Sequence, residues 1–268
     1  MSLLRSKHCT AVLAPTGIAI VPWERRKPIP TSATIIDCAP LGDEPNWRGP
    51  LTALKKWADQ QGGGRLEIDV ILSNRFLQFA LLPWSSDLNG QEEIMQMARI
   101  QFEALFGSAA KDRVKVSDSE YGAPSIACAL DSLLLSELVT IAAEGNLVLN
   151  SLAPYFMLAF NNWRKRIPDE GLLVVLEREC CVMLSVRGGT IAGIRSVKLH
   201  ADDLAVLPAI IERELLLHGM GEQASVLLHS LGDRAVVRLE NGIEPEQLQT
   251  PGPNGPHPLA NMAMLVEH

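Results

Sequence analysis

The stretch that decides the fold is ACALDSLLLSELVTIAAEGNLVLNSLAPYFMLAF, residues 127 to 160. Its first part predicts a strand near residues 125 to 129 that leads into a helix from Ser132 to Glu144. Asp131 is placed to cap that helix, because a short carboxylate there can accept hydrogen bonds from the otherwise unpaired amides of the first turn. Asn150 and Ser151 interrupt the apolar run. The stretch therefore lacks the roughly 20 unbroken apolar residues that a membrane span needs.

The residues before this stretch predict further strands and helices. Apolar residues at strand spacing predict strands at 9 to 14, 18 to 23, 34 to 38, 65 to 73 and 75 to 82. Helical spacing predicts helices at 50 to 61 and 91 to 106. We expect Asn74 to occupy a tight turn that needs a left-handed residue.

The second half predicts a similar series of elements. Strands are expected at 172 to 176, 181 to 186, 190 to 197, 225 to 228 and 235 to 239, and helices at 202 to 218 and 259 to 268. Each half therefore begins with three strands and then alternates helix and strand, which is a repeat of architecture rather than of residues. The charged segment WRKRIPDEG, from Trp163 to Gly171, is the expected boundary between the halves.

Composition and cysteine content restrict the class of protein. The chain has 268 residues, of which 47% are hydrophobic and 21% charged, as is typical of a globular protein. A net charge of −7 argues against a general nucleic-acid binder. The five cysteines form no Cys-x-x-Cys pair, and the first residues lack a signal-peptide core, so we expect reduced, buried thiols in a cytoplasmic protein.

Three segments resemble one family. They are residues 127 to 160, the segment VILSNRFLQFALLPW at 70 to 84, and LANMAMLVEH at 259 to 268. In their order along the chain, 70 to 84, 127 to 160 and 259 to 268, they are similar to the PilM and GspL-like cytoplasmic assembly proteins of type IV pili and type II secretion, which have the actin-like ATPase fold. The resemblance implies an α/β, duplicated actin-like (RNase H-like) fold.

The same resemblance implies a division into domains. The first domain would span residues 1 to 166, with a small inserted α+β subdomain at about 70 to 125. The second would span residues 167 to 268, and its last helix, 259 to 268, would pack back on the first domain.

The family pattern also places the turns that would bind nucleotide, and their residues depart from it. Active members carry an Asp-x-Gly type turn in each half, in which the carboxylate organises magnesium and glycine lets amides approach phosphate. In LAPTGIAI, residues 13 to 20, Ala14 stands where the Asp belongs, although Thr16 and Gly17 could still form a turn. The second half has Glu177 without a glycine, and the later turn keeps only Gly232. We therefore expect no catalytic residue, no cofactor and no metal. Nucleotide held without hydrolysis, and an ATPase or kinase-like enzyme with atypical loops, stay open as alternatives.

Other residues that could carry chemistry have simpler explanations. His200, His218 and His229 have no zinc-site spacing, and we expect them on the surface or at helix ends. Cys180 and Cys181 are neighbours on a predicted strand and point to opposite faces, which favours two small apolar residues over a disulfide.

Two basic runs have an aromatic residue beside them: Trp23 to Lys27 and Trp163 to Arg166. They are either ordinary exposed charge or contacts for acidic lipid headgroups or for the cytoplasmic tail of a partner. The family resemblance favours a non-catalytic cytoplasmic scaffold that binds inner-membrane assembly proteins. It leaves open whether the chain associates peripherally with the inner membrane and whether it forms a homodimer.

Overall fold

The computed structural model of the chain describes residues 7–39, 44–61, 64–88, 90–107, 113–199, 204–221, 223–231 and 237–266. Its contacts divide the chain into two compact units, which are described separately below. The first unit comprises Met1–Phe76, Ser132–Leu158 and Thr250–His268, and the second comprises Leu77–Asp131 and Ala159–Gln249. The boundaries expected from the order of the chain, 1 to 166 with an insertion at 70 to 125 and then 167 to 268, stay a prediction.

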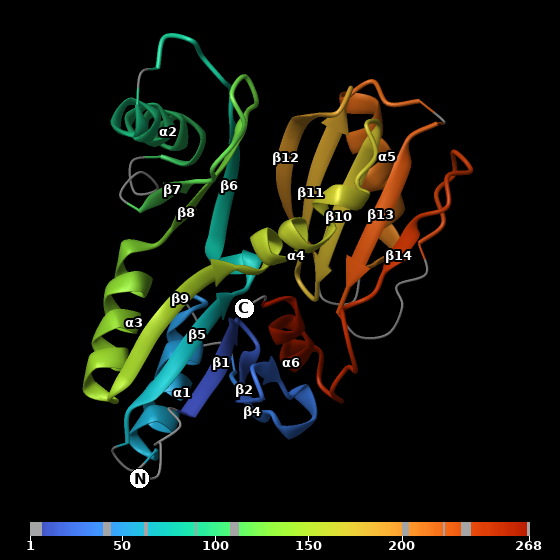
Figure 1. Cartoon of the computed structure of the whole chain (residues 1–268). Coiled ribbons are helices and arrows are strands. Elements are labelled where there is room, and N and C mark those ends of the chain that lie inside the picture. Colours follow the sequence, from blue (N-terminus) through green and yellow to red (C-terminus); the bar gives the residue numbers. More distant parts are fainter. Residues whose placement is uncertain are drawn as a thin grey trace. The chain divides into compact units, whose positions relative to one another are not determined.

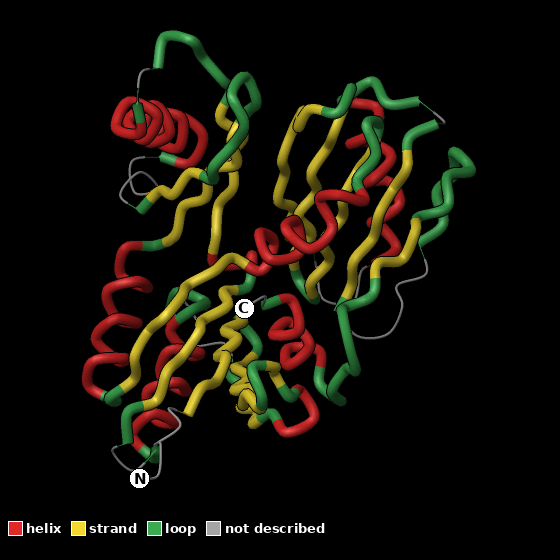
Figure 2. Tube along the Cα trace, in the orientation of Figure 1, coloured by secondary structure: helices red, strands yellow, loops and turns green. Residues whose placement is uncertain are grey.

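The first unit is built on a mixed sheet. Its strands are β1 (Lys7–Ala14), β2 (Gly17–Glu24), β3 (Lys27–Pro28), β4 (Thr34–Asp37), β5 (Leu66–Leu72) and β9 (Leu147–Pro154). They follow the order β3-β2-β1-β5-β9, and β4 pairs with β2. The strands β1, β5 and β9 run parallel, whereas β2 is antiparallel to β1 (Figure 1). Figure 2 shows the strands of the chain in yellow and its helices in red.

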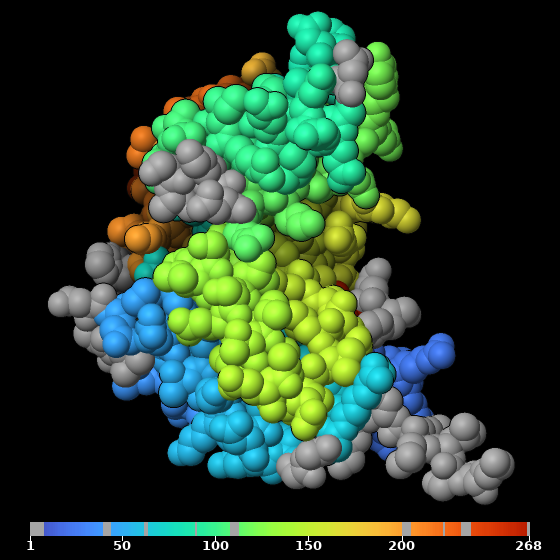
Figure 3. Space-filling view, turned by 90° about the vertical axis from the view of Figure 1, so that its left-hand side faces the viewer, coloured from blue at the N-terminus to red at the C-terminus, as the bar shows by residue number. Residues whose placement is uncertain are grey.

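Helices cover this sheet. The helix α1 (Arg48–Asp59) buries Leu51, Leu54 and Trp57, which share one face because they recur at intervals of three residues. It packs against α3 (Ser132–Glu144), which also contacts β9. The outer face of α3 is solvent-exposed (Figure 3). The chain closes with α6 (Pro258–Met262) and a 3₁₀ turn at Ala263–Leu265. The helix predicted at 259 to 268 is therefore shorter than expected, and it contacts β1 and β2.

The second unit contains a sheet of the same topology. Its strands are β10 (Gly171–Glu177), β11 (Cys180–Arg187), β12 (Thr190–Lys198), β13 (Ser225–Ser230) and β14 (Glu246–Leu248), in the order β12-β11-β10-β13-β14. The helix α5 (Leu207–Leu217) packs on one face, where its Leu207, Ile211 and Leu215 meet Val174 and Met183. In both units the first strand has an antiparallel hairpin partner on one side and a parallel strand on the other. The predicted duplication is confirmed.

The second unit also holds a smaller sheet, formed by β6 (Leu77–Leu82), β7 (Val114–Val116) and β8 (Ser125–Leu130) in the order β6-β8-β7. The helix α2 (Gln91–Phe106) covers it through buried Ala98 and Phe102. Phe102 is fully buried among Ala80, Leu82 and Val114, as expected of an apolar helical stripe.

One local prediction is wrong. Asn74 begins a 3₁₀ turn (Asn74–Phe76) rather than occupying a left-handed position, and among the described non-glycine residues positive φ angles occur at Arg25, Arg26 and Asn146. Asn74 is buried, and its Oδ1 accepts a 2.9 Å hydrogen bond from the amide of Phe156. It therefore satisfies a donor in the first turn of α4 (Tyr155–Trp163).

Within the described residues, no helix is both long and apolar enough to cross a membrane.

Candidate functional site

The turn between β1 and β2 holds Ala14, Thr16 and Gly17 of the predicted first phosphate loop. Ala14 pairs with Gly17 across the hairpin, so Pro15 and Thr16 form the turn itself. Pro15 has no amide hydrogen to offer a phosphate. The Thr16 carbonyl accepts a 2.9 Å hydrogen bond from the Cys38 amide. The turn is thus tied to the segment after β4 and presents few free backbone donors.

Gly17 has a structural role in this turn. A β-carbon at this position would lie 2.7 Å from the Ile36 carbonyl oxygen, well inside van der Waals contact. Gly17 pairs with Asp37 of β4, so the missing side chain lets β4 approach β2. Close packing of β4 against β2 is therefore sufficient to explain Gly17, which the sequence had suggested as part of a phosphate-binding turn.

The corresponding turn in the second unit joins β10 and β11. Glu177 ends β10, pairs with Cys180 and is only 6% exposed. Arg178 and Glu179 form the turn, and the Glu179 carbonyl accepts a 3.1 Å hydrogen bond from the Leu199 amide. Every residue from 177 to 180 carries a side chain, so the backbone cannot approach a ligand as closely as a glycine would allow. Gly232, of the third predicted turn, lies outside the described residues.

Comparisons with known proteins place this architecture. No protein-family model matches the chain, and no curated protein sequence matches it. Among solved structures, the cytoplasmic domain of EpsL, an inner-membrane component of the type II secretion system of Vibrio cholerae, is similar with a TM-score of 0.59 and 15% identity, over 97% of this chain and 93% of that one.

Two further structures agree. A Bacteroides thetaiotaomicron protein with an actin-like ATPase fold and unknown function has a TM-score of 0.62 and 9% identity, over 97% of this chain and 96% of that one. The chain has the actin-like ATPase fold. A PilM–PilN type IV pilus biogenesis complex gives a TM-score of 0.62 and 13% identity, over 91% of this chain and 88% of that one. The fold expected from the sequence is confirmed.

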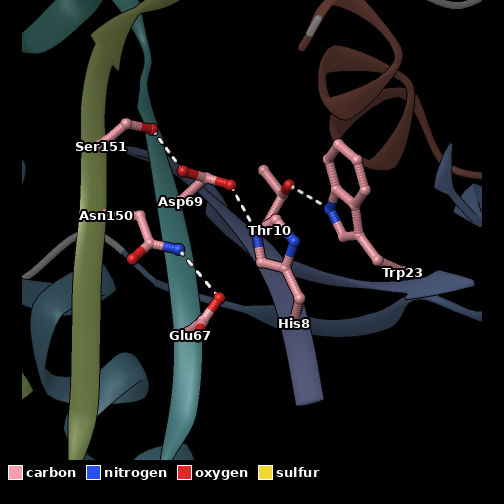
Figure 4. Close-up of polar contacts among 7 residues, drawn as sticks. All are labelled: His8, Thr10, Trp23, Glu67, Asp69, Asn150 and Ser151. Atoms are coloured by element: carbon pink, nitrogen blue, oxygen red, sulfur yellow. Dashed lines mark hydrogen bonds and ion pairs between the residues drawn. The ribbon is translucent and has the colours of Figure 1, made fainter. Parts of the chain in front are cut away.

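The first sheet of this actin-like chain also holds a polar cluster that sequence reasoning missed. Asp69 of β5 is only 2% exposed and lies between two donors (Figure 4). The Nε2 of His8 on β1 lies 2.5 Å from Asp69 Oδ2, and the hydroxyl of Ser151 on β9 donates to Oδ1 at 2.5 Å. The strand register brings the cluster together, because Asp69 pairs with Thr10 on one side and Ser151 on the other.

The order of these groups argues against nucleophilic catalysis. In a catalytic triad the imidazole lies between the hydroxyl and the carboxylate and takes the proton of the hydroxyl. Here the carboxylate lies between His8 and Ser151, so the hydroxyl donates to an acid and is not activated by the histidine. We interpret the cluster as a means of satisfying a buried charge across neighbouring strands.

Trp23 extends the cluster to β2. Its indole ring stacks on His8 with ring centroids 4.6 Å apart, and its Nε1–H donates to the buried Thr10 hydroxyl at 2.8 Å (Figure 4). The sequence did contain one signal, which is a pair of polar residues two positions apart on each strand. These pairs are His8 and Thr10 on β1, and Glu67 and Asp69 on β5. That pattern alone could not show which strands are neighbours.

The histidines separate into different environments. His229 is fully buried, so the expectation of a surface residue is wrong for it. Its Nδ1 lies 3.2 Å from the Leu248 carbonyl oxygen and its ring packs on Trp163, with centroids 4.3 Å apart. Burial lowers the pKa of His229 to about 4, and the hydrogen bond to Leu248 opposes this only in part. His218 follows the end of α5 and interacts with Glu214, as expected of a helix-end residue, whereas His200 lies outside the described residues.

The cysteines and acids form no further site in the described ranges. None of the five cysteines, all of which the structure describes, forms a disulfide, and Cys180 and Cys181 are both buried. Burial raises the pKa of Cys9 and of Cys128 to about 12, so these thiols remain protonated and unreactive at neutral pH. Among the residues that the structure describes, no three His, Cys, Asp or Glu side chains gather as metal ligands.

Proposed function

We propose that the chain is a non-catalytic cytoplasmic scaffold of a type IV pilus or type II secretion-like assembly that binds the cytoplasmic part of inner-membrane partners. The observation that carries the assembly role is the extent of the structural likeness. It covers 97% of the chain for the cytoplasmic EpsL domain and 91% for the PilM–PilN complex. The inserted sheet and both halves are thus included, so the likeness goes beyond one shared half of the fold.

The composition of the turns supports the non-catalytic part of the proposal. Ala14 and Pro15 remove a magnesium-organising acid and a phosphate-binding amide from the first turn. Gly17 serves the packing of β4, and the second turn has no glycine. Phosphoryl transfer needs a metal ion and well-positioned hydrogen-bond donors, because these stabilise the charge of the transition state. A chain with these turns is better suited to holding partners than to hydrolysing ATP.

Capture from native membranes tests the scaffold role. The full chain with an affinity tag is expressed in cells with an intact pilus or secretion apparatus, and membrane extracts are purified in mild detergent. We expect a bitopic inner-membrane assembly protein to co-purify, and to be lost when its cytoplasmic segment is deleted. A chain that purifies without such a protein from these cells would contradict the scaffold role. The Ala14→Gly variant serves as control, because a change in the turn leaves docking intact under this proposal.

The alternative, an ATPase or kinase-like enzyme with atypical loops, is favoured by one feature. Glu177 places a buried carboxylate at the end of β10, where an acid of the second phosphate turn would stand. A single-turnover assay with radiolabelled ATP and magnesium tests it. Hydrolysis that is lost in Glu177→Gln, in a sample that stays folded, would support the enzyme and contradict the scaffold.

A further inference from the structure

The hairpin between β2 and β3 carries two adjacent arginines in an unusual conformation. Glu24 pairs with Lys27 across the ladder, so Arg25 and Arg26 alone form the loop. Their φ angles are 50° and 65°, both in the left-handed region. A two-residue hairpin with positive φ at both positions is a type I′ turn, which ordinarily takes Asn-Gly or Gly-Gly.

The second unit shows the residues that such a turn normally takes. Between β11 and β12, Arg187 pairs with Thr190, and the intervening Gly188 and Gly189 have φ angles of 56° and 73°. Glycine adopts this conformation without a steric penalty, whereas a residue with a β-carbon does not. Strained residues of this kind concentrate at ligand-binding sites, where their side chains have a use that offsets the strain. Arg25 and Arg26 therefore invite a functional explanation.

The base of this hairpin is fixed to the sheet. Trp23, two residues before the loop, stacks on His8 and donates a hydrogen bond to Thr10 (Figure 4). The adjacent Ile29 amide donates to the Pro22 carbonyl at 2.9 Å. Trp23 thus attaches the hairpin to the sheet, and Arg25 and Arg26 lie on a rigidly held loop. A rigid support lowers the entropy lost when the arginines bind a ligand.

Further positive charge lies at the same edge of the sheet. β2 is antiparallel to β1 and β5 is parallel to it, so the end of β2 and the start of β5 share one edge. Arg65 directly precedes β5 and is exposed, as are Arg25, Arg26 and Lys27. We call Arg25, Arg26, Lys27 and Arg65 the basic edge. The acid on this hairpin, Glu24, stands opposite Lys27 and offsets one charge.

The basic edge is not used for ion pairs within the part of the chain that the structure describes, where basic residues such as Arg48, Lys55, Arg166 and Arg195 do have carboxylate partners. The overall charge does not oppose a local anion site either. By sequence the first unit has ten Lys and Arg against ten Asp and Glu, so the chain's net charge of −7 belongs to the second unit. The unit that carries the basic edge is therefore neutral overall.

We propose that the basic edge binds the phosphate headgroups of an anionic membrane surface. Guanidinium groups pair with phosphate in a bidentate manner, and clustered Lys and Arg bind anionic leaflets. A row of charges along the rim of a sheet suits many headgroups in one plane. Single-stranded nucleic acid would also need exposed aromatic rings for stacking, and the aromatic ring of this hairpin, Trp23, is occupied by His8.

This inference rests on the charges of the first unit and is separable from the assembly role. Binding of anionic vesicles without capture of an assembly protein would support the lipid site and contradict the scaffold role. Capture of a partner in detergent without vesicle binding would support the scaffold role and contradict the lipid site.

Vesicle flotation with the full chain tests the proposal. The vesicles contain either phosphatidylcholine alone or phosphatidylcholine with phosphatidylglycerol, at low and at raised salt. We expect binding to the anionic vesicles only, weakened by salt because the interaction is screened. Inorganic phosphate should compete no better than chloride at equal ionic strength, which distinguishes a headgroup surface from a site for the free ion.

The variant Arg25→Asn/Arg26→Gly removes two charges and keeps a sequence suited to the turn. Since each basic residue near an anionic surface contributes roughly fivefold to binding, we expect binding to weaken about thirtyfold. The matched control is Arg164→Gln/Lys165→Gln, which removes two exposed charges from the second unit and should bind as the original chain does.

Three outcomes would overturn the proposal. The first is unchanged vesicle binding by Arg25→Asn/Arg26→Gly, checked by its melting temperature to be folded. The second is an equal loss in the Arg164→Gln/Lys165→Gln control, which would indicate general charge attraction. The third is tighter binding of a single-stranded oligonucleotide than of anionic vesicles, with the same loss in the hairpin variant, which would make nucleic acid the ligand.

Discussion

Thr10 and Asp69 are paired in the first sheet where Leu173 and Leu227 are paired in the second. These positions are equivalent: Thr10 lies four residues before Ala14, the last residue of β1, and Leu173 lies four residues before Glu177, the last residue of β10. Both pairs are almost fully buried. Each row continues to an exposed residue on the next strand, Ser151 beside Asp69 in the polar row and Glu246 beside Leu227 in the second sheet. The same sheet topology therefore tolerates a buried carboxylate where His8 and Ser151 donate to it, and takes an apolar pair where neither donor is present.

The largest expected effect comes from placing the polar group of the first sheet in the second. Leu227→Asp would bury a carboxylate among Leu173 and its apolar neighbours, with no His8 or Ser151 to donate to it. We expect a loss of more than about 4 kcal/mol in the free energy of unfolding, enough to unfold the second unit. Urea denaturation followed by circular dichroism measures it. Leu227→Met conserves volume and should cost less than about 1.5 kcal/mol, and equal losses in both variants would remove charge as the cause.

The buried histidine of the second sheet should make its stability depend on pH. The pKa of His229 is about 4 when folded and 6.5 when unfolded, so between these values the unfolded state binds more protons. The stability is therefore full above pH 6.5 and falls by about 3 kcal/mol as the pH drops to 4. Hydrogen exchange of β13 peptides between pH 7.5 and 4.5 follows this unit alone. His229→Gln, which can still donate to Leu248, should show a weaker decline, and an unaltered decline would assign it to other groups.

Removing the polar row of the first sheet should cost less. Asp69→Ala leaves His8 and Ser151 without their acceptor, but His8 is 20% exposed and Ser151 is open to solvent, so water can replace the carboxylate. We expect a loss of about 2 kcal/mol in thermal or urea unfolding. Ser151→Ala removes one donor and should cost about 1 kcal/mol. A loss above 4 kcal/mol for Asp69→Ala would show that the row is sealed from water.

The smallest effect concerns the two tight turns. Arg25→Asn/Arg26→Gly should raise the free energy of unfolding by about 1 kcal/mol, because the left-handed conformation then costs less. Gly188→Arg/Gly189→Arg should lower it by about 2 kcal/mol for the opposite reason. Differential scanning calorimetry of both variants makes the comparison. A loss of stability in the first variant would mean that Arg25 and Arg26 stabilise the hairpin and are not strained in it.

Much of the fold could be predicted because it depends on local pattern. The hairpin at 9 to 23, the helix ending near Gln61 and the apolar stripe around Phe102 follow from spacing within short windows. The strand predicted at 235 to 239 is wrong for residues 237 to 239, the part of it that the structure describes, because these residues are irregular. The strand β14 forms at Glu246–Leu248 instead. A three-residue strand that adds to the edge of a sheet leaves no periodic signal.

The site depended on contacts between distant residues and was harder to predict. Ala14 ends β1 and Glu177 ends β10, and their assignment to phosphate turns stays a prediction. The sequence could not show that Gly17 makes room for Ile36, since that needs the position of β4. His8, Asp69 and Ser151 are separated by more than sixty residues at each step and meet only through strand register. Register is a tertiary property, so polar residues on separate strands cannot be grouped from local pattern alone.

A thermal-shift titration with ATP and magnesium tests the central claim most directly. Nucleotide at a hundred times its dissociation constant would add about 2.7 kcal/mol to the folded state. We predict no change in melting temperature up to millimolar ATP, for the original chain and for Ala14→Asp, because one restored acid leaves Pro15 and the glycine-free second turn in place. A saturable rise in melting temperature with the original chain, accompanied by phosphate release, would contradict the claim that this actin-like protein is a non-catalytic scaffold.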